Sequence, residues 1–182
     1  EYNYFSADNL WNGKLLFLKS LSPLAKQQGE VFASHIGYQS TRWNWRLQQE
    51  YISGNYSAEV GFIPRNNYIK LQATGGYLYY SNKETPLLSH GPRVGRTYYF
   101  DTDFNKKDQT QQLDYLFNFK NRSRFTLGIR RQYIELLTDF DPLRTQIAKL
   151  TAGTKHEWNS FTFSILFCPH AFVFRHLFIT HT

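Results

Sequence analysis

Methionine is absent from this chain of 182 residues, and cysteine occurs once, at Cys168. A single cysteine excludes an internal disulfide. No apolar run approaches the ~18 residues that a membrane-spanning helix requires, and the longest, such as the one at 15–18, has only the length of a strand. The length suits one domain, residues 1–182. The lack of methionine and the apolar alternating segment at 178–182 lead us to expect a piece of a longer protein, cut at both ends.

Motifs for common catalytic and metal-binding chemistry are also lacking. The sequence has no glycine-rich phosphate loop, no nucleophile elbow and no recognisable Cys-His pair. The acidic segment 101–108 suggests a calcium loop, but an EF-hand requires Gly and Glu where this chain has Lys106 and Gln112. We interpret the segment as a solvated polar loop, with loose calcium binding as the alternative.

Two further groups of polar residues could in principle carry chemistry. Asp139 and Asp141 form a carboxylate pair of the kind that glycosidases use, but their spacing before Pro142 is typical of a turn. Four histidines gather towards the end of the chain with Cys168, and their spacing matches no common zinc site. They are His156, His170, His176 and His181. We therefore expect no catalytic residue, no metal ligand and no cofactor.

What the chain does have is aromatic side chains and positive charge. Aromatic residues make up 18%, with 16 Phe and 13 Tyr, and the formal net charge is +7. A basic balance suits nucleic acid, an anionic membrane surface or acidic glycans as partners.

Apolar and polar residues alternate along most of the chain. In 125–133, for example, Phe125, Leu127 and Ile129 alternate with Thr126 and Arg130. Successive side chains of a strand point to opposite faces, so this period of two predicts strands with one apolar and one mostly polar face. The pattern predicts about nine strands, at 10–19, 30–40, 42–52, 68–80, 93–101, 109–120, 123–135, 158–167 and 171–181.

The lengths of these strands and of their connections indicate the fold class. Most predicted strands have 9 to 13 residues, whereas about 9–11 suffice for a tilted strand to cross a bilayer and about 5–6 are usual in soluble sheets. Tight turns at 40–41 and 121–122 alternate with longer links at 20–29, 53–67 and 136–157. Many aromatic residues fall near strand ends. This combination is typical of outer-membrane barrels. We predict an all-β, antiparallel up-and-down meander that forms part of a transmembrane β-barrel, about nine strands of a larger one.

Parity along the strands predicts which side chains would face the interior of such a barrel. Leu127 and Phe117 are expected to face lipid. The residues expected to face the lumen are Arg46, Lys70, Asn118, Lys120 and Arg130. Arg131 breaks the pattern, because parity places it with Ile129 on the apolar face. Either its side chain reaches the membrane interface or a bulge shifts the register there.

The segment "NYSAEVGFIPRNNYIKL" at 55–71 contains a compact knot, Gly61-Phe62-Ile63-Pro64-Arg65. Proline cannot donate to a strand ladder, so Pro64 suits the entry to a strand. We interpret the knot as structural: Phe62 and Ile63 would pack inward over the barrel rim, and Arg65 would hold the loop.

This segment resembles a recurring element of a family of large Bacteroidota surface proteins, catalogued as domain of unknown function 5916. Further matching elements follow in the same order at 87–94 (LLSHGPRV), 136–142 (LLTDFDP) and 150–161 (LTAGTKHEWNSF), so the resemblance covers most of residues 10 to 165. The tail from Cys168 fits less well. The resemblance implies a C-terminal outer-membrane barrel behind an N-terminal carbohydrate-binding-like domain, which this chain does not contain.

We therefore interpret the chain as a non-enzymatic outer-membrane β-barrel segment of a Gram-negative envelope protein. Its expected partner is outer-membrane lipid, with glycans implied only through the missing domain. One alternative is a soluble extracellular β-sheet module that binds carbohydrate. A second is a basic nucleic-acid-binding β-protein, which is not the expected reading because most aromatic rings alternate with polar residues along long strands.

A first prediction concerns solubility. Open sheet edges aggregate in water and are not tolerated in lipid. Expression of residues 1–182 without detergent is therefore expected to give inclusion bodies. A monodisperse soluble peak in size-exclusion chromatography would contradict this prediction.

Overall fold

A computed structural model describes residues 1–21, 28–56, 65–139, 141, 150–166 and 173–181. These residues contain strands and turns but no helix, so none of them forms a helix able to span a membrane. The strands are β1 (Tyr2–Phe5), β2 (Trp11–Leu21), β3 (Gln28–Gln39), β4 (Trp43–Ile52), β5 (Tyr68–Tyr77), β6 (Tyr79–Tyr80), β7 (Leu87–Phe100), β8 (Lys106–Phe119), β9 (Arg124–Glu135), β10 (Lys155–Leu166) and β11 (Val173–His181).

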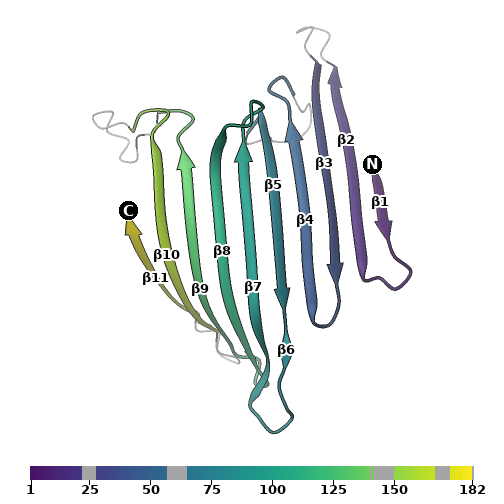
Figure 1. The fold of residues 1–182 in the computed structure, drawn as a ribbon, viewed down its shortest axis with the longest axis vertical. Helices are drawn as coiled ribbons and strands as arrows, with labels where there is room; N and C mark the ends of the chain where they lie inside the picture. The colour runs from purple at the N-terminus through teal and green to yellow at the C-terminus, as the bar shows by residue number, and fades with distance from the viewer. Residues whose placement is uncertain (22–27, 57–64, 140, 142–149, 167–172, 182) are drawn as a thin grey trace.

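All strands belong to one antiparallel sheet, which confirms the predicted all-β class. Each strand pairs with the one before it and the one after it in the chain, and β1 and β11 lie at the two edges (Figure 1). The short β6 lies off this path and pairs with β7. The connections 53–67, 101–105 and 136–154 follow strands that end on one side of the sheet, which we call the loop end. The connections 40–42, 81–86 and 120–123 lie at the opposite, turn end.

One predicted boundary is wrong, and the reason lies at Pro92. The sequence predicted a link at 81–92 and a strand at 93–101, whereas β7 begins at Leu87. Pro92 fits inside β7 because the ladder between β5 and β7 stops at the pair Gly76–Arg93, one residue before the missing N–H group. β7 still pairs with β8 at Pro92–Tyr115. Part of the predicted link, from Leu87 onwards, is therefore strand, and at Gly91 and Pro92 this strand is paired only with β8.

Two short strands were also missed. β1 has only four residues, and the predicted strand at 68–80 is divided into β5 and β6. The division falls at Leu78, whose backbone N–H donates to the carbonyl oxygen of Arg42 at 2.9 Å. This bond continues the ladder towards β4 by one residue, and pairing with β7 resumes at Tyr79–His90.

The register divides the sheet into two chemically different faces. Trp45, Gly75, Val94, Leu113 and Ile129 form one row across five neighbouring strands. We call this face the apolar face and the opposite one the polar face. Large side chains of the apolar face are widely exposed, for example Leu47 at 51%, Leu113 at 50% and Leu127 at 45%. By contrast, only three hydrophobic residues of the described chain are buried, and all three lie on the polar face: Val31, Ile52 and Tyr68.

An uninterrupted band of the apolar face carries no Asp, Glu, Lys or Arg among the described strand positions. Its members on β4 and β5 lie between Trp43 and Tyr51 and between Ile69 and Tyr77, with Gln49 as a polar exception. On β7 and β8 they are His90 to Val94 and Leu113 to Phe117, and on β9 and β10 they are Phe125 to Ile129 and Phe161 to Ile165. We call this region the apolar band.

Aromatic rings line the turn end of the apolar band. Trp11 contacts Tyr38 and Trp45, with ring centroids 5.1 and 5.3 Å apart. A second run of neighbouring rings continues across β4 to β10, with neighbouring centroids 4.6–6.2 Å apart: Trp43, Tyr77, Tyr79, His90, Phe117, Phe125 and Phe163. The aromatic residues expected near strand ends therefore form contacts from strand to strand.

The register also decides between the two explanations offered for Arg131. β9 pairs without a shift to both β8 and β10 through this residue, so the bulge explanation is wrong. Arg131 lies on the apolar face beyond the apolar band, and its Nε donates to Glu157 of β10.

Glycines on β7 provide a test of the close approach between β5 and β7. A β-carbon at Gly91 would lie 1.8 Å from the carbonyl oxygen of Tyr77, whereas one at Gly95 would meet only Thr74 Cγ2 at 3.9 Å. Gly91→Ala is therefore expected to destabilise the fold by about 1–3 kcal/mol, and Gly95→Ala to change it by less than about 1 kcal/mol. Denaturant unfolding followed by circular dichroism in detergent measures both. Equal stability of the two variants would show that β5 and β7 do not approach in this way.

Candidate functional site: the polar face and its loop-end clusters

A buried carboxylate lies at the centre of the polar face. Asp114 on β8 is only 4% exposed. Its Oδ2 accepts bonds from Nε and Nη2 of Arg93 on β7, at 3.0 and 2.6 Å, and from Nε2 of Gln112 at 2.6 Å. Arg130 on β9 donates from Nη2 to Oε1 of Gln112 at 3.0 Å. The four side chains therefore tie three strands together, and they give the buried charge the partners that it requires.

Space for this carboxylate comes from the opposing strand. Gly128 on β9 pairs with Asp114 in register, and a β-carbon there would lie 2.5 Å from Asp114 Oδ1. Any other residue would displace the carboxylate from Arg93.

The sequence-predicted lumen residues fall on or beside this face. Arg46, Lys70, Asn118 and Arg130 lie on the polar face by register. Asn118 donates from Nδ2 to Ser89 Oγ at 3.1 Å and accepts from Arg124 Nε at 2.9 Å. Lys120 lies one residue beyond β8, where its ammonium group contacts the carbonyl oxygen of Lys83 in the turn. Whether these residues face a lumen stays a prediction.

The polar face is positively charged overall. From β2 to β10 it carries six cationic residues and three carboxylates, which leaves an excess of three positive charges with histidine neutral. The cations are Lys14, Arg46, Lys70, Arg93, Arg124 and Arg130, and the carboxylates are Glu50, Asp108 and Asp114.

A second cluster occupies the loop end of the polar face. Arg65 precedes β5, and its Nη1 donates to Oδ2 of Asp108 on β8, so its side chain reaches past β7. The guanidinium carbon of Arg65 lies 5.4 Å from the ring centroid of Tyr99 on β7, and Lys70 Nζ lies 5.8 Å from the same centroid. Such cation–ring contacts add to the ion pair where water is partly excluded. Both partners of the ion pair are only 23% exposed.

Apolar packing accompanies this cluster. Tyr68 lies 5.6 Å from Tyr99, ring to ring, and its hydroxyl donates to Glu50. The buried residues Val31 and Ile52 complete a small core, against which Tyr56 packs. A β-carbon at Gly29 would lie 2.2 Å from Cα of Tyr56, so the segment after β4 lies directly on the backbone of β3. The loop end of the polar face is thus covered by the chain itself.

The predicted knot is only partly visible in this arrangement. Gly61, Phe62, Ile63 and Pro64 lie outside the described residues. Arg65 is described, and Asp108 is its ion-pair partner, which the sequence alone did not identify. The structural role of the five-residue knot as a whole stays a prediction.

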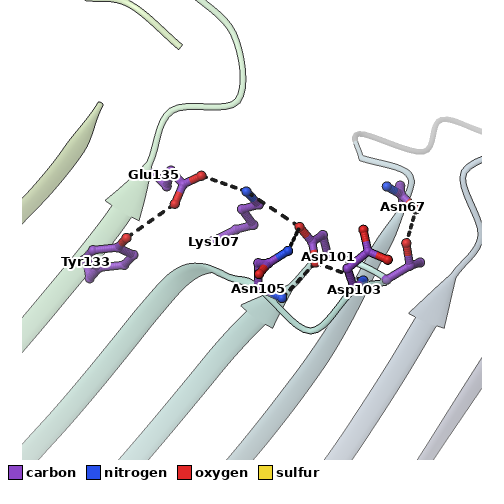
Figure 2. A network of polar contacts seen from close by, with 8 residues as sticks. Asn67, Asp101, Asp103, Asn105, Lys107, Tyr133 and Glu135 are labelled. Atoms are coloured by element: carbon purple, nitrogen blue, oxygen red, sulfur yellow. Dashed lines mark hydrogen bonds and ion pairs between the residues drawn. The ribbon is translucent and has the colours of Figure 1, made fainter. Parts of the chain in front are cut away.

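Figure 2 shows a third cluster, at the rim formed by the β7–β8 hairpin. Asp101 Oδ1 accepts the backbone N–H groups of Asp103 and Asn105 at 3.0 and 2.8 Å, and Oδ2 accepts from Asn105 Nδ2 at 3.1 Å. Lys107 Nζ lies 2.7 Å from Glu135 Oε1 and 3.7 Å from Asp101 Oδ2. Burial opposes ionisation of Asp101, but the hydrogen bonds from Asn105 and Asp103 and the charge of Lys107 outweigh it and lower its pKa.

This rim cluster uses its carboxylates to hold a turn. The oxygens of Asp101 face N–H groups and an ammonium group, and Thr102 Oγ1 donates to Asn67 Oδ1 at 3.1 Å across to the connection before β5. In the part of the chain that the structure describes, no group of three or more His, Cys, Asp or Glu is placed to hold a metal ion. The turn at 101–105 fits the polar-loop interpretation, whereas Lys106 to Asp108, which were predicted as part of the loop, belong to β8.

The remaining candidate residues form no common site among the described residues. Asp139 Oδ1 accepts the backbone N–H of Ala152 at 2.9 Å, and the predicted turn before Pro142 lies outside the described residues. His156 lies on the polar face of β10 with a buried Nε2. Cys168 and His170 lie outside the described residues, and His176 and His181 belong to β11.

Comparisons with protein-family models, with curated proteins and with solved structures found no match for this chain. The resemblance noted from the sequence motifs therefore stays an expectation.

The Arg65–Asp108 pair generates a prediction about the loop. Arg65→Ala removes a shielded charge-assisted hydrogen bond, worth roughly 1.5–3 kcal/mol, and leaves Asp108 without its cation. Proteolysis within 53–67 is expected to become faster by about tenfold or more, while the sheet stays folded. Arg42→Ala, in the exposed turn at the other end, is the matched control and is expected to leave cleavage unchanged. Unchanged loop protection in Arg65→Ala would show that this pair does not hold the loop.

Proposed function

We propose that this chain is a wall segment of a non-enzymatic outer-membrane β-barrel in a Gram-negative envelope. The apolar face would contact lipid, and the polar face would line the lumen. One observation carries the proposal: the apolar band is exposed, free of charged residues at its described strand positions and continuous across the strands. Such a surface requires a cover, because each large apolar side chain left in water forgoes about 1.5–3 kcal/mol of burial.

The dimensions of the apolar band suit a bilayer. Trp43 and Tyr51 lie eight residues apart on β4 and mark the ends of the band there. At about 3.4 Å per residue this separation is roughly 27 Å along the strand. A tilt of about 35–45° reduces it to roughly 20 Å along the membrane normal, close to the ~25 Å apolar band of outer-membrane barrels.

The apolar band also runs obliquely to the hydrogen-bonded rows. Trp45 on β4 and Ile129 on β9 belong to the same row. On β4 the band continues towards the loop end through Leu47 to Tyr51, whereas on β9 the next residue of the apolar face after Ile129 is Arg131. The apolar band therefore lies nearer the loop end on β4 than on β9. Strands that are tilted relative to the membrane, as they are in barrels, would cross the bilayer at different rows and so produce this displacement.

The polar face would give the interior an anionic preference. Its excess of three positive charges includes Arg46, which forms no hydrogen bond or ion pair with the described residues. Field lines concentrate in a low-dielectric channel, so small anions would enter more readily than cations. A link to glycans through a further domain rests on the family resemblance alone.

The two alternatives fit these observations less well. A soluble carbohydrate-binding module would need a second layer over the apolar band. A single-strand nucleic-acid binder needs cations and exposed rings on one surface. Here Arg46, Lys70 and Arg130 lie on the face opposite to Trp43 and Tyr79, and the cations that share a face with these rings, such as Arg131, lie towards the loop end, away from the rings at the turn end.

A pair of adjacent substitutions on β9 tests the proposal. Leu127 lies in the middle of the apolar band, and Thr126 lies on the polar face at nearly the same depth. An arginine facing lipid at the midplane costs about 2–4 kcal/mol, and one facing the lumen costs little. In the full-length protein Leu127→Arg is expected to abolish heat-modifiable mobility on gels, and Thr126→Arg to leave it intact. Thr126 is a better control than Asn118, which bonds to Ser89 and Arg124.

Tryptophan fluorescence can distinguish whether lipid or protein covers the apolar band. Trp11, Trp43 and Trp45 lie on the apolar face and Trp158 lies on the polar face. Brominated acyl chains are therefore expected to quench the first three and to spare Trp158, as single-tryptophan variants would show. The proposal would be contradicted if Leu127→Arg and Thr126→Arg impaired assembly equally and brominated acyl chains quenched none of the tryptophans. That result would indicate a sheet in water with protein packed on both faces.

A further inference from the structure

A group of charges borders the apolar band on its loop side. Across β7 to β10 the apolar face carries four cations and two carboxylates there, which we call the charged collar: Arg96, Lys106, Arg131, Lys155, Glu135 and Glu157. The carboxylates already have cationic partners, because Glu157 accepts from Arg131 and Glu135 binds Lys107. Lys106 lies over the ring of Tyr133, 4.3 Å from its centroid.

Arg96 differs from Lys155 of this collar, because Lys155 lies opposite Glu135 in register, whereas no carboxylate lies in the row of Arg96. Arg96 is exposed, and it forms no hydrogen bond or ion pair with the residues that the structure describes. Its neighbours in the same row are Ala73 on β5 and Gln111 on β8, neither of which carries a charge. The guanidinium therefore has its donors available to a ligand.

An apolar hollow lies beside Arg96. It has a volume of about 530 Å³, and it is lined on one side by Val94, Leu113 and Ile129 and bordered on the other by Arg96 and Arg131. The hollow exists because Gly75 occupies the position between Trp45 and Val94 in the row and contributes no side chain. A long apolar chain can lie in it with its polar end at the arginines.

We propose that this hollow and Arg96 bind an anionic, phosphate-bearing lipid of the leaflet on the loop side, with an acyl chain on Val94 and Leu113 and the phosphate at Arg96. Charge complementarity supports this site, because an apolar hollow that ends at an unpaired guanidinium fits an anion with an apolar tail. The planar fork of arginine matches two phosphate oxygens. Basic positions beside a membrane core recognise anionic head groups in the same manner. This inference rests on the proposed membrane location.

Native mass spectrometry of the full-length protein, extracted in a mild non-ionic detergent, tests the site. Phosphatidylglycerol is expected to bind more tightly than phosphatidylcholine. Arg96→Gln is expected to weaken phosphatidylglycerol binding about tenfold, the change for one charge-assisted contact. The substitution breaks no internal contact, so folding should be unaffected. Arg46→Gln removes the same charge from the polar face and is expected to leave lipid binding unchanged.

The outcomes separate the two proposals. An inserted protein with no preference for phosphatidylglycerol, or an equal loss in both variants, would overturn the lipid site alone. Displacement of the lipid by millimolar inorganic phosphate would also overturn it, because the acyl chain would then contribute nothing. Recovery of the protein in the aqueous fraction would overturn the membrane location, and the lipid site with it.

Discussion

The two faces of this sheet depend on the antiparallel ladder keeping the same register parity through the middle of β2 to β10, with register shifts only near the two ends of the β7–β8 ladder, at Leu87/Ser89 and Tyr99/Phe100. Backbone N–H and C=O groups bond only to neighbouring strands, and side chains alternate between two faces. Because parity is preserved, Trp45, Val94, Leu113 and Ile129 meet in one row, and Arg93, Asp114 and Gly128 meet in the next row of the opposite face. A slip of one residue in any strand would exchange its apolar and polar side chains.

The buried charges of the polar face act as register markers. Asp114 requires Arg93 on one side and the empty space of Gly128 on the other. If β9 slipped by one residue, Leu127 or Ile129 would lie opposite the carboxylate of Asp114. The carboxylate would then lose its space, and Gln112 would lose its contact with Arg130. At the loop end, the Arg65–Asp108 pair fixes the start of β5 against β8. The polar network therefore contributes to the specificity of strand pairing, which a uniformly apolar face could not supply.

Much of this arrangement is encoded locally and could be predicted. Alternation over 113–119 and 125–133 correctly assigned Leu127 and Arg130 to opposite faces, because parity needs no tertiary information. The link predicted at 81–92 was wrong because glycine and proline, here Gly91 and Pro92, usually interrupt a strand. They fit inside β7 because the ladder between β5 and β7 ends at Gly76–Arg93, so that Pro92 needs to donate no hydrogen bond to β5. The partners Arg93–Asp114 and Arg65–Asp108 could not be deduced, since they depend on register between strands. A lone carboxylate at mid-strand was nevertheless a signal that Asp114 needed a cation.

The order of contacts has a consequence for how the sheet could grow, both during folding and during evolution. Among the described residues, each of the long strands forms its backbone ladders only with the long strands that precede and follow it in the chain, and the short β6 pairs with β7. Stability is then close to a sum of nearest-neighbour terms, as in repeat proteins. Loop-closure entropy stays small because every pairing joins segments that are adjacent in the chain. Hairpins can therefore be added one after another at an edge without rearranging those already formed, and duplication of a hairpin would lengthen the sheet while leaving the Asp114 network intact.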